Sequence, residues 1–377
     1  AWLRAIMNLT DGPLIRAAYL NLGPERPGRL LFTVHHLAID GVSWRILLED
    51  FQLVYSQLAA GEEVTLPPKT TSYRQWARKL VDHAQTENVR KQSEYWLSKA
   101  TDDIARLPLD FETGENTEAS AQTVVTTLDE EKTEALLSKV PAVYHTQIND
   151  VLLTALARVI SQWIDSSSVW LTLESHGREP LFDDVDLSRT VGWFTVLYPV
   201  RLDLQGTSDL GGALMAVKEQ LRQVPDHGIG YGLLRYLSQD QELAGQLGSV
   251  PESEICFNYL GQFDAVFQDE TQGFTPAEET TGPDRSLAGD RGCILDINGG
   301  ITGGRLQMVW SYSENLHRRE TIERLAEAYT TTLRDIIAHC RSPEAGGYTP
   351  SDFPMANLDQ RKLDKVLSKL DASQNSG

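Results

Sequence analysis

The stretch RLLFTVHHLAIDGVSW, residues 29–44, predicts a strand, a corner and the start of a helix in direct succession. Arg29–Ile39 is rich in β-branched and apolar residues, a composition typical of a buried strand. Gly41 ends this strand, and apolar side chains then recur at helical spacing until Gly61, a helix stop signal. The recurring positions are Trp44, Leu47, Leu48, Phe51, Tyr55 and Leu58. We therefore expect two histidines and one aspartate to lie at a strand-to-helix corner.

Outside this stretch, predicted strands and helices interleave, and no internal repeat is visible. Helices are expected at Tyr73–Leu97 (as one or two), Ile148–Trp163, Leu210–Val224 and Arg319–His339. Strands are expected at Gln122–Leu128, Val169–Leu173, Glu254–Leu260 and within Val191–Leu204. Two further strands, Leu295–Ile297 and Leu306–Tyr312, flank an expected turn at Asn298-Gly299-Gly300. This pattern predicts an α/β (α+β) chain.

A polar stretch divides the chain into two parts. Between Ala100 and Ala121 the sequence turns polar and contains Pro108, Gly114 and several acids. A common domain holds about 100–200 residues, so a chain of 377 residues fits two packed units. We expect a first lobe at residues 1–115, a second lobe at residues 116–350, and a polar linker or tail at residues 351–377.

Charge and cysteine content exclude several classes of protein. Lys and Arg number 34 against 53 Asp and Glu, and a formal charge of −19 repels nucleic acid and anionic membranes. No apolar run reaches the roughly 18 residues that a membrane span needs. Cys256, Cys293 and Cys340 are odd in number and form no C-x-x-C pair, which argues against a disulfide scaffold or a zinc ribbon and favours the reducing cytoplasm. The start at Ala1 lacks an initiator Met and a signal pattern, as expected for an internal cut from a longer polypeptide.

Three polar residues lie at the corner after the first strand. Because side chains alternate faces along a strand, His35 and His36 point apart and do not bind one metal ion together. One of them can face a cavity, where an imidazole with a pKa of about 6.5 exchanges a proton at neutral pH. The alternative is a strand-end histidine held by backbone hydrogen bonds. Asp40 is expected to accept from the first amides of the helix or to pair with a buried arginine, and both roles are structural.

Two other strand ends carry polar side chains. Glu174 shares a strand face with Trp170 and Thr172, where apolar neighbours raise the pKa of a carboxyl and make it a proton acceptor near neutrality. The alternative is a surface acid in a turn. Asn258 and Tyr259 lie on opposite faces of their strand. The Asn258 amide can donate to a carbonyl or enolate oxygen, or it can satisfy its own backbone at the strand end.

Five segments of the chain carry a resemblance to a known family. They are HHLAIDGVSW (35–44), ESHGRE (174–179), RTVGWFTVLYPV (189–200), VKEQLRQVPDHGIGYG (217–232) and FNYLGQF (257–263). In this order they resemble the signature motifs of the epimerization domains of nonribosomal peptide synthetases, in the condensation-domain superfamily. HHLAIDGVSW resembles the superfamily motif HHxxxDG, and ESHGRE resembles the subfamily motif EGHGRE with Ser in place of the first Gly. The resemblance extends from about Gly12 to His339.

The resemblance implies a fold of two chloramphenicol-acetyltransferase-like lobes that form a V-shaped pseudo-dimer with a tunnel between them. His36 would come from the first lobe, and Glu174 and Asn258 from the second. Members of the family carry a further half lobe upstream of HHxxxDG, so the first lobe would be incomplete at its N-terminus here. In the family a strand of the second lobe crosses over to the first, and Leu295–Tyr312 is the candidate for it.

The chemistry implied by the resemblance is epimerization at Cα of an aminoacyl or peptidyl thioester. The substrate would be carried on the phosphopantetheine of a carrier domain, and the chain would need no metal ion or cofactor of its own. His36 and Glu174 would be the two catalytic proton-transfer groups. Asn258 and Tyr259 would support the substrate or its enolate.

The same resemblance implies structural residues and partners. His35, Asp40, Gly41 and Arg178 would be structural, with Arg178 as the partner of Asp40. A peptidyl carrier domain, normally fused upstream, and a downstream condensation domain would be the partners, with no nucleic acid and no membrane. Two alternatives remain. A condensation domain that forms peptide bonds shares HHxxxDG but is not expected to carry ESHGRE or NYLGQ, and a catalytically silent module would only dock other proteins.

Overall fold

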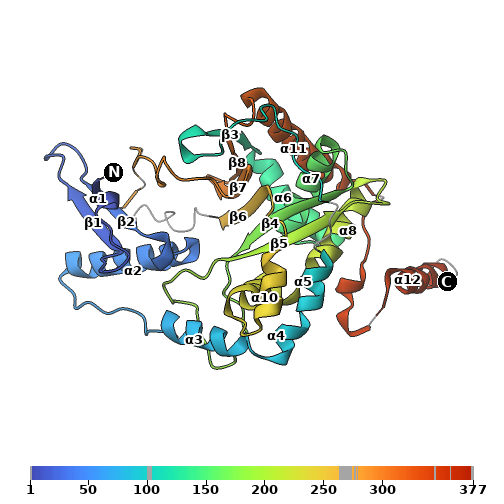
Figure 1. Cartoon of the computed structure of the whole chain (residues 1–377), viewed down its shortest axis with the longest axis horizontal. Helices are drawn as coiled ribbons and strands as arrows, with labels where there is room; N and C mark the ends of the chain where they lie inside the picture. The colour runs from blue at the N-terminus through green and yellow to red at the C-terminus, as the bar shows by residue number, and fades with distance from the viewer. Residues whose placement is uncertain are drawn as a thin grey trace.

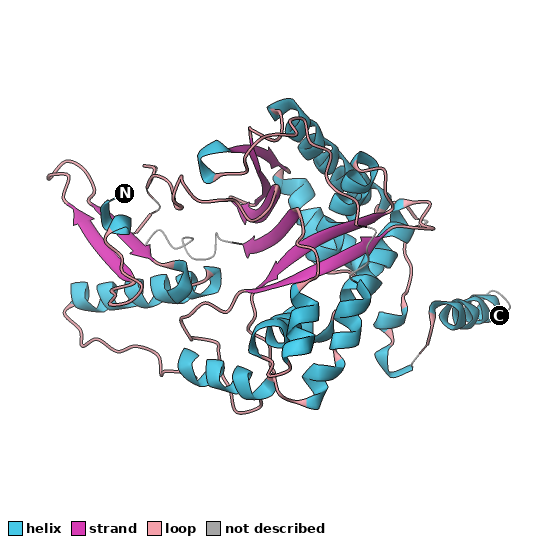
Figure 2. Cartoon of the chain, viewed as in Figure 1, coloured by secondary structure: helices cyan, strands magenta, loops and turns pink. Residues whose placement is uncertain are grey.

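The computed structural model describes residues 2–99, 104–262, 274–275, 277, 279–343, 345–356 and 358–374. The elements form a mixed α/β fold around a six-stranded sheet, with a smaller two-stranded layer beside it (Figures 1 and 2). The α/β class expected from the interleaved pattern is confirmed. The pseudo-dimeric arrangement of two acetyltransferase-like lobes stays a prediction.

The six-stranded sheet brings the expected strands of the second part of the chain together. It contains β3 (Ala121–Thr127), β4 (Ser168–Ser175), β5 (Val196–Asp203), β6 (Ile255–Gln262), β7 (Leu295–Thr302) and β8 (Arg305–Ser313), in the order β3-β8-β7-β6-β4-β5. β6 is parallel to both of its neighbours, β4 and β7, and the other pairs are antiparallel. Because parallel strands end at the same edge of a sheet, Glu174 and Asn258 meet at one edge.

Four helices pack on this sheet: α6 (Glu130–Tyr144), α7 (Ile148–Trp163), α8 (Leu210–Arg222) and α11 (Arg319–His339). Three of them agree with the predicted helices, and α11 has the expected bounds. No helix was predicted over the residues of α6, which contains Pro141 in its interior. Its start is nevertheless well defined, since the Asp129 carboxylate caps it by accepting from the amide of Lys132 at 3.0 Å.

The smaller layer consists of the antiparallel strands β1 (Ile15–Leu20) and β2 (Arg29–Val34), with α2 (Gly41–Ala60) along them and α1 (Trp2–Ala5) before them (Figure 1). β2 is shorter than predicted, because a 3-10 turn at His36–Ala38 replaces its expected end. α2 has the expected bounds. It ends at Gly61, which adopts the left-handed conformation with φ 72°.

Three short helices occupy the region in which one or two were expected: α3 (Tyr73–His83), α4 (Glu87–Lys91) and α5 (Ser93–Lys99). α9 (Ile229–Gly232) and α10 (Gln241–Gly248) pack near them. Trp76 and Trp96 are 2% and 1% exposed and belong to the hydrophobic core of the six-stranded sheet. These helices therefore precede the polar stretch but pack with the part of the chain that follows it. The lobe boundaries at residues 1–115 and 116–350 stay a prediction.

Two expectations for Leu295–Tyr312 are wrong. The hairpin turn lies at Gly303-Gly304, where Thr302 pairs with Arg305, so the predicted turn at Asn298–Gly300 lies inside β7. Both turn glycines have positive φ, 58° and 69°, which a two-residue hairpin turn requires. Neither β7 nor β8 is a strand that crosses to the first layer, because both lie in the six-stranded sheet.

Phe274 and Glu279, in the connection between β6 and β7, contact the smaller layer. Arg29 forms an ion pair with Glu279 at 2.9 Å, and the ring of Phe274 packs against that of Phe51 with 5.3 Å between centroids. The described residues of this connection contain no strand that pairs with β1 or β2. Phe263, the last residue of FNYLGQF, lies outside the described residues.

The cysteines and the C-terminal segment also differ from expectation. Cys256 and Cys293 form a disulfide, with 6.0 Å between their Cα atoms, and Cys340 is free. The argument from cysteine count missed this pair because the parallel pairing of β6 with β7 brings the two residues together. The tail at residues 351–377 contains the helix α12 (Gln360–Gln374), and its role as a linker stays a prediction. Within the described residues, no helix is long and apolar enough to cross a membrane.

Candidate active site

Asp40 lies at the corner between the two layers and is 4% exposed. Its Oδ1 accepts from the Ser43 amide at 2.7 Å and caps α2, of which Gly41 is the first residue. Its Oδ2 accepts from the amide of Phe194 at 3.0 Å. The Arg178 guanidinium donates to Oδ1 at 3.2 Å, so the ion pair implied by the family resemblance is present. Asp40 thus fills both structural roles between which the sequence left the choice open.

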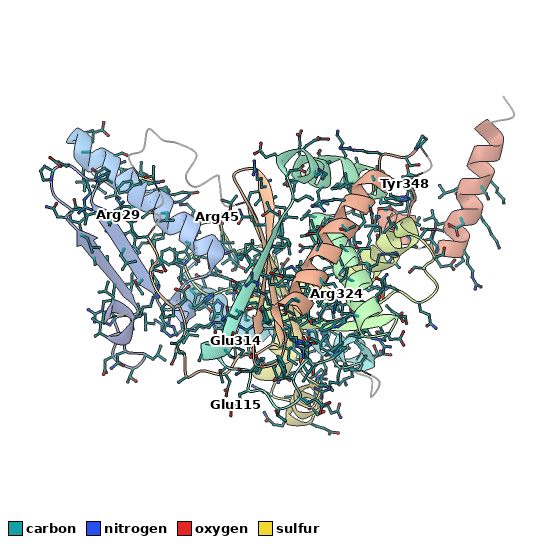
Figure 3. All side chains as sticks on the ribbon, turned by 90° about the horizontal axis from the view of Figure 1, so that it is seen from above. Arg29, Arg45, Glu115, Glu314, Arg324 and Tyr348 are labelled. Atoms are coloured by element: carbon teal, nitrogen blue, oxygen red, sulfur yellow. A yellow bond between two sulfur atoms is a disulfide. The ribbon has the colours of Figure 1, made fainter. Side chains whose placement is uncertain are left out.

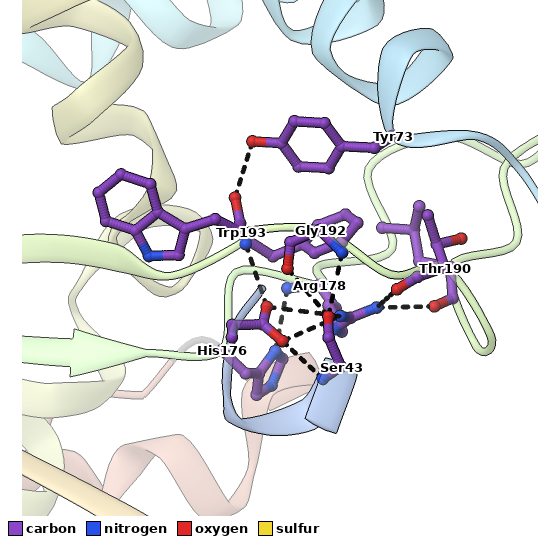
Figure 4. A network of polar contacts seen from close by, with 10 residues as sticks. Ser43, Tyr73, His176, Arg178, Thr190, Gly192 and Trp193 are labelled. Atoms are coloured by element: carbon purple, nitrogen blue, oxygen red, sulfur yellow. Dashed lines mark hydrogen bonds and ion pairs between the residues drawn. The ribbon is translucent and has the colours of Figure 1, made fainter. Parts of the chain in front are cut away.

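Arg178 ties this corner to the loop that follows β4 (Figure 4). Its Nη1 donates to the carbonyl oxygens of Leu187 and Thr190, at 2.9 Å each. Its Nη2 also donates to Ser43 Oγ at 2.9 Å, and the guanidinium lies 4.0 Å from the ring centroid of Phe194. Since the Arg178 side chain is only 10% exposed, these contacts fix the corner rather than leave the charge free for a ligand.

Ser43 and Gly177 complete the network, and sequence reasoning missed both. Ser43 Oγ donates to the Gly192 carbonyl at 2.9 Å and accepts from the Gly192 amide at 3.1 Å. Gly177 has φ 62°, and a Cβ there would lie 1.8 Å from the carbonyl oxygen of Phe194. Glycine is therefore required within ESHGRE. No local pattern marks the Ser43 contact, because its partner is 149 residues away.

His35 and His36 follow β2 and have different surroundings. The His35 amide donates to the Leu14 carbonyl at 2.8 Å, and its Nδ1 accepts from the Leu37 amide at 3.2 Å, so His35 is held by its own turn. His36 is exposed, and its ring lies edge-on to Trp193 with 5.7 Å between centroids. Strand alternation, from which we predicted their orientations, does not apply, because β2 ends before both residues.

Glu174 and Asn258 lie side by side on neighbouring parallel strands. Leu173 of β4 pairs with Phe257 of β6, and the next residue on each strand is Glu174 and Asn258. In a parallel pair, residues in register share a face of the sheet, so the carboxylate and the amide lie on one face. Asn298 on β7 continues this row, since it pairs with Asn258. A row of three polar side chains therefore crosses three neighbouring strands of the sheet.

The surroundings of Glu174 alter its acidity in the direction that the sequence predicted. Burial raises the pKa of Glu174 above its ordinary value of 4.5, because desolvation disfavours the charged carboxylate. The charges of His36 and Arg285 lower the pKa of Glu174 by favouring the carboxylate, whereas the charge of Asp296 raises it further.

A cavity of about 460 Å³ lies between the start of α2 and the ends of β4 and β6. Asp40 and Gly41 line one side of it, and Glu174, Asn258 and Tyr259 line the other. Asn258 and Tyr259 are consecutive residues of β6 and so lie on opposite faces of the strand, as predicted, yet both line the cavity. Burial raises the pKa of Tyr259. His36 is not among the residues that line this cavity.

A second, smaller cavity of about 170 Å³ shares Glu174 and Asn258 with the first. Its other walls include the charged residues Arg285, Arg291 and Asp296, none of which sequence reasoning singled out. In the described part of the chain, no three His, Cys, Asp or Glu side chains come together in a group that could hold a metal ion.

Comparisons with known proteins identify the family of the chain. The family model of the condensation domain matches residues 1–358. One of the subunits of linear gramicidin synthase from Brevibacillus parabrevis is 48% identical over 369 residues, which cover 97% of this chain. Chondramide synthase cmdD from Chondromyces crocatus is 44% identical over 380 residues, which cover 99% of it. The chain spans only 5% and 9% of the length of these two relatives.

Solved structures give the same family. The crystal structure of the epimerization domain from the third module of tyrocidine synthetase B is similar with a TM-score of 0.83 and 38% identity, over 90% of this chain and 75% of that one. The SgcC5 protein from Streptomyces globisporus, 16% identical with a TM-score of 0.65 over 89% of this chain and 74% of that one, shares the fold. The chain therefore belongs to the condensation-domain family of nonribosomal peptide synthetases.

Proposed function

We propose that the chain is an epimerization domain, which interconverts the L and D configurations at Cα of an aminoacyl or peptidyl thioester. The observation that carries this proposal is the convergence of three groups from two layers. Glu174 and Asn258 lie together on a cavity wall, and His36 lies in the turn before α2, whose first residue Gly41 lines the same cavity. The similarity to a solved epimerization domain at 38% identity supports it.

The chemistry requires two proton-transfer groups on opposite sides of Cα. A thioester acidifies its α-proton, because the resulting enolate is delocalised onto the carbonyl oxygen. One of Glu174 and His36 removes the proton, and the other returns a proton to the opposite face. The raised pKa of Glu174 suits this role, since the carboxyl can then exist in either protonation state closer to neutral pH.

Asn258 and Tyr259 would support the substrate. Asn258 is adjacent to Glu174 in the sheet, so its amide can donate to an acceptor on the group whose proton Glu174 transfers. Asp40 and Arg178 play a different part, because they are engaged with each other and with backbone groups. They hold the start of α2 against the loop after β4. His36 lies in the turn just before α2, and Glu174 lies near the end of β4.

The substrate would arrive on the phosphopantetheine arm of a peptidyl carrier domain, and a downstream condensation domain would take the product. The chain would supply no cofactor of its own, since both proton-transfer groups are side chains. We expect these partners to lie in the same synthetase or in an adjoining one.

Loss of isotope from Cα tests the proposal directly. The synthetase that contains this chain is loaded on its carrier domain with an L-alanyl, L-leucyl or L-phenylalanyl thioester deuterated at Cα. Epimerization breaks the Cα–D bond, so deuterium should wash out into water while D product accumulates, without a second amino acid. Comparing Glu174→Gln and His36→Ala from the deuterated L thioester and from the deuterated D thioester assigns the two groups to the two faces, since each variant should impair removal of the proton from one of the two substrates more strongly.

The same experiment separates the alternative functions. The condensation-domain match gives peptide-bond formation as the second candidate. If the label is retained and an amide forms with a second carrier-bound amino acid, the chain condenses rather than epimerizes. If the label is retained and the carrier binds without any product, the chain is a docking module.

A further inference from the structure

The smaller cavity next to Glu174 contains two arginines that differ in how their charge is compensated. Arg285 donates to a Glu118 carboxylate oxygen at 2.9 Å and forms an ion pair with it. Arg291 donates to the Ser311 hydroxyl at 2.8 Å, which is a neutral partner. Its Nε is buried and has no acceptor. Among the described residues, Ser311 is the only hydrogen-bond acceptor that the Arg291 guanidinium contacts.

Burial makes this incomplete pairing unfavourable for Arg291. Burial lowers the pKa of Arg291, and the more distant charges of Glu118 and Asp296 only partly oppose the effect. Asp296, which shares the cavity, accepts instead from the Asn298 amide at 2.8 Å. A partly desolvated guanidinium with unused donors is stabilised by an anionic or strongly accepting oxygen.

The cavity brings this cation to the place where the proposed reaction develops negative charge. Arg291, Glu174 and Asn258 line the same space of about 170 Å³. When the Cα proton leaves, the electron pair of the C–H bond forms a double bond to the carbonyl carbon, and the charge moves to the oxygen. An oxygen placed in this small space would have Arg291 and Asn258 among the residues around it.

We propose that Arg291 is a further catalytic residue, whose guanidinium donates to the thioester oxygen and stabilises the enolate. This inference rests on the proposed epimerase function. The proton passes to Glu174 or His36 and returns from the other group, so Arg291 donates hydrogen bonds without losing a proton. Two donors on one oxyanion, here Arg291 and Asn258, form an arrangement that acts more strongly on the transition state than on the neutral ground state.

Arg291→Gln tests the inference in the isotope experiment above, with the L-alanyl, L-leucyl and L-phenylalanyl thioesters as probes. Removal of one oxyanion donor typically lowers kcat by about 10²–10³-fold, so we expect a fall of this size in the rate of deuterium loss. The KM for the loaded carrier should stay unchanged, because the interaction forms mainly in the transition state. Arg285→Gln is the matched comparison and should lower kcat much less, since Arg285 is already paired with Glu118.

Arg291→Lys is the second variant, for the case in which Arg291→Gln does not fold. Lysine keeps the charge but lacks the planar fork, so kcat should fall less than with glutamine and KM should stay unchanged. Deuterium loss at the wild-type rate in the folded variants would overturn the inference. A raised KM with unchanged kcat would overturn it too, because Arg291 would then only bind the ground state. If the wild-type protein loses no deuterium, the proposed function itself fails, and this inference fails with it.

Discussion

Two carboxylates at the junction of the layers, Asp40 and Glu174, have opposite surroundings. The oxygens of Asp40 accept from two backbone amides and from Arg178, and the side chain is 4% exposed. The Glu174 carboxylate accepts no hydrogen bond from a described side chain or backbone amide, and the residue lines both cavities. Figure 3 shows Arg45 near the start of α2, and its guanidinium donates to the Leu260 carbonyl of β6 at 3.1 Å.

This difference indicates how the roles divide. A buried carboxylate whose oxygens all accept hydrogen bonds from the protein links the helix and loop that carry its donors. Replacing it should therefore lower the free energy of unfolding. A half-buried carboxylate without donors carries a desolvation cost that the protein does not relieve, which is a common property of groups that act on a ligand. The predictions below test whether stability and activity separate between these two sites.

The largest effect should come from Glu174→Gln. The change removes the proton-transfer group and keeps the shape, so deuterium loss from Cα should slow by about 10²–10⁴-fold. Thermal unfolding should be unchanged or slightly raised, because the glutamine carries no charge to desolvate. Glu49→Gln on the exposed side of α2, where the partner is Arg189, is the control and should behave as wild type in both measurements. A lowered Tm with retained exchange would make Glu174 a structural residue.

Asp40→Ala should act mainly on stability. It leaves the buried Arg178 without its carboxylate partner, and breaking such a pair costs about 3–5 kcal/mol. Asp50→Ala is a matched control on the same helix, because Asp50 pairs with Arg189 near the surface and should contribute about 0–1 kcal/mol. Urea denaturation of the two variants measures the difference. Unchanged unfolding with selective loss of epimerization would show that Asp40 takes part in the chemistry.

The elements that the sequence predicted well are those with a strong period. α11 and the strands of the sheet were found because apolar residues repeat at 3.6 or 2 positions along them. The hairpin turn was misplaced because Asn298-Gly299-Gly300 has turn composition while strand pairing keeps it extended. Both Asn298-Gly299-Gly300 and Gly303-Gly304 have the composition of a turn, and the pairing of β7 with β8 places the turn at the second of them.

The candidate site was only partly accessible from the sequence. The raised pKa of Glu174 and the opposite faces of Asn258 and Tyr259 follow from strand geometry. The Asp40–Arg178 pair spans 138 residues, and only the family motifs implied it. The sequence did not single out Arg291. Its proposed role depends on the incomplete hydrogen bonding of its buried guanidinium, and that can be seen only in the folded structure.

A buried histidine, His317, should make the stability of the protein depend on pH. The His317 side chain is 0% exposed, its nitrogens have no hydrogen-bond partner, and Asp110 lies 3.7 Å away. Burial lowers the pKa of His317 below its ordinary value of 6.5, although Asp110 and Glu254 partly oppose this. The unfolded chain therefore binds this proton more readily than the folded chain. Its contribution to stability is present above pH 6.5 and is lost as the pH falls below it.

His317→Gln should remove this pH dependence. In wild type, one proton binds to His317 on unfolding when the pH is below the ordinary pKa of histidine. The free energy of unfolding should therefore fall by up to about 1.4 kcal/mol more per pH unit than it would without His317. Urea denaturation at a series of pH values from neutral downward should give a shallower slope for the variant, whatever its stability at neutral pH. An unchanged slope would mean that His317 binds its proton equally in the folded and unfolded chains.

The smallest effect is expected at Ser175, the residue next to Glu174 and the one departure of ESHGRE from its family pattern. The hydroxyl of Ser175 is buried without a hydrogen-bond partner, yet the residue lines the larger cavity. Ser175→Ala removes an unsatisfied polar group, so stability should be unchanged or raised by about 1 kcal/mol. Ser313→Ala is the matched control. Its hydroxyl contacts Ser120 Oγ at 2.7 Å and accepts from the Asn315 amide at 3.2 Å, so its loss should cost about 1–3 kcal/mol. If Ser175→Ala instead slows deuterium loss from Cα at unchanged stability, the hydroxyl finds its partner in the substrate, and Ser175 belongs with Glu174 rather than with the network around Asp40.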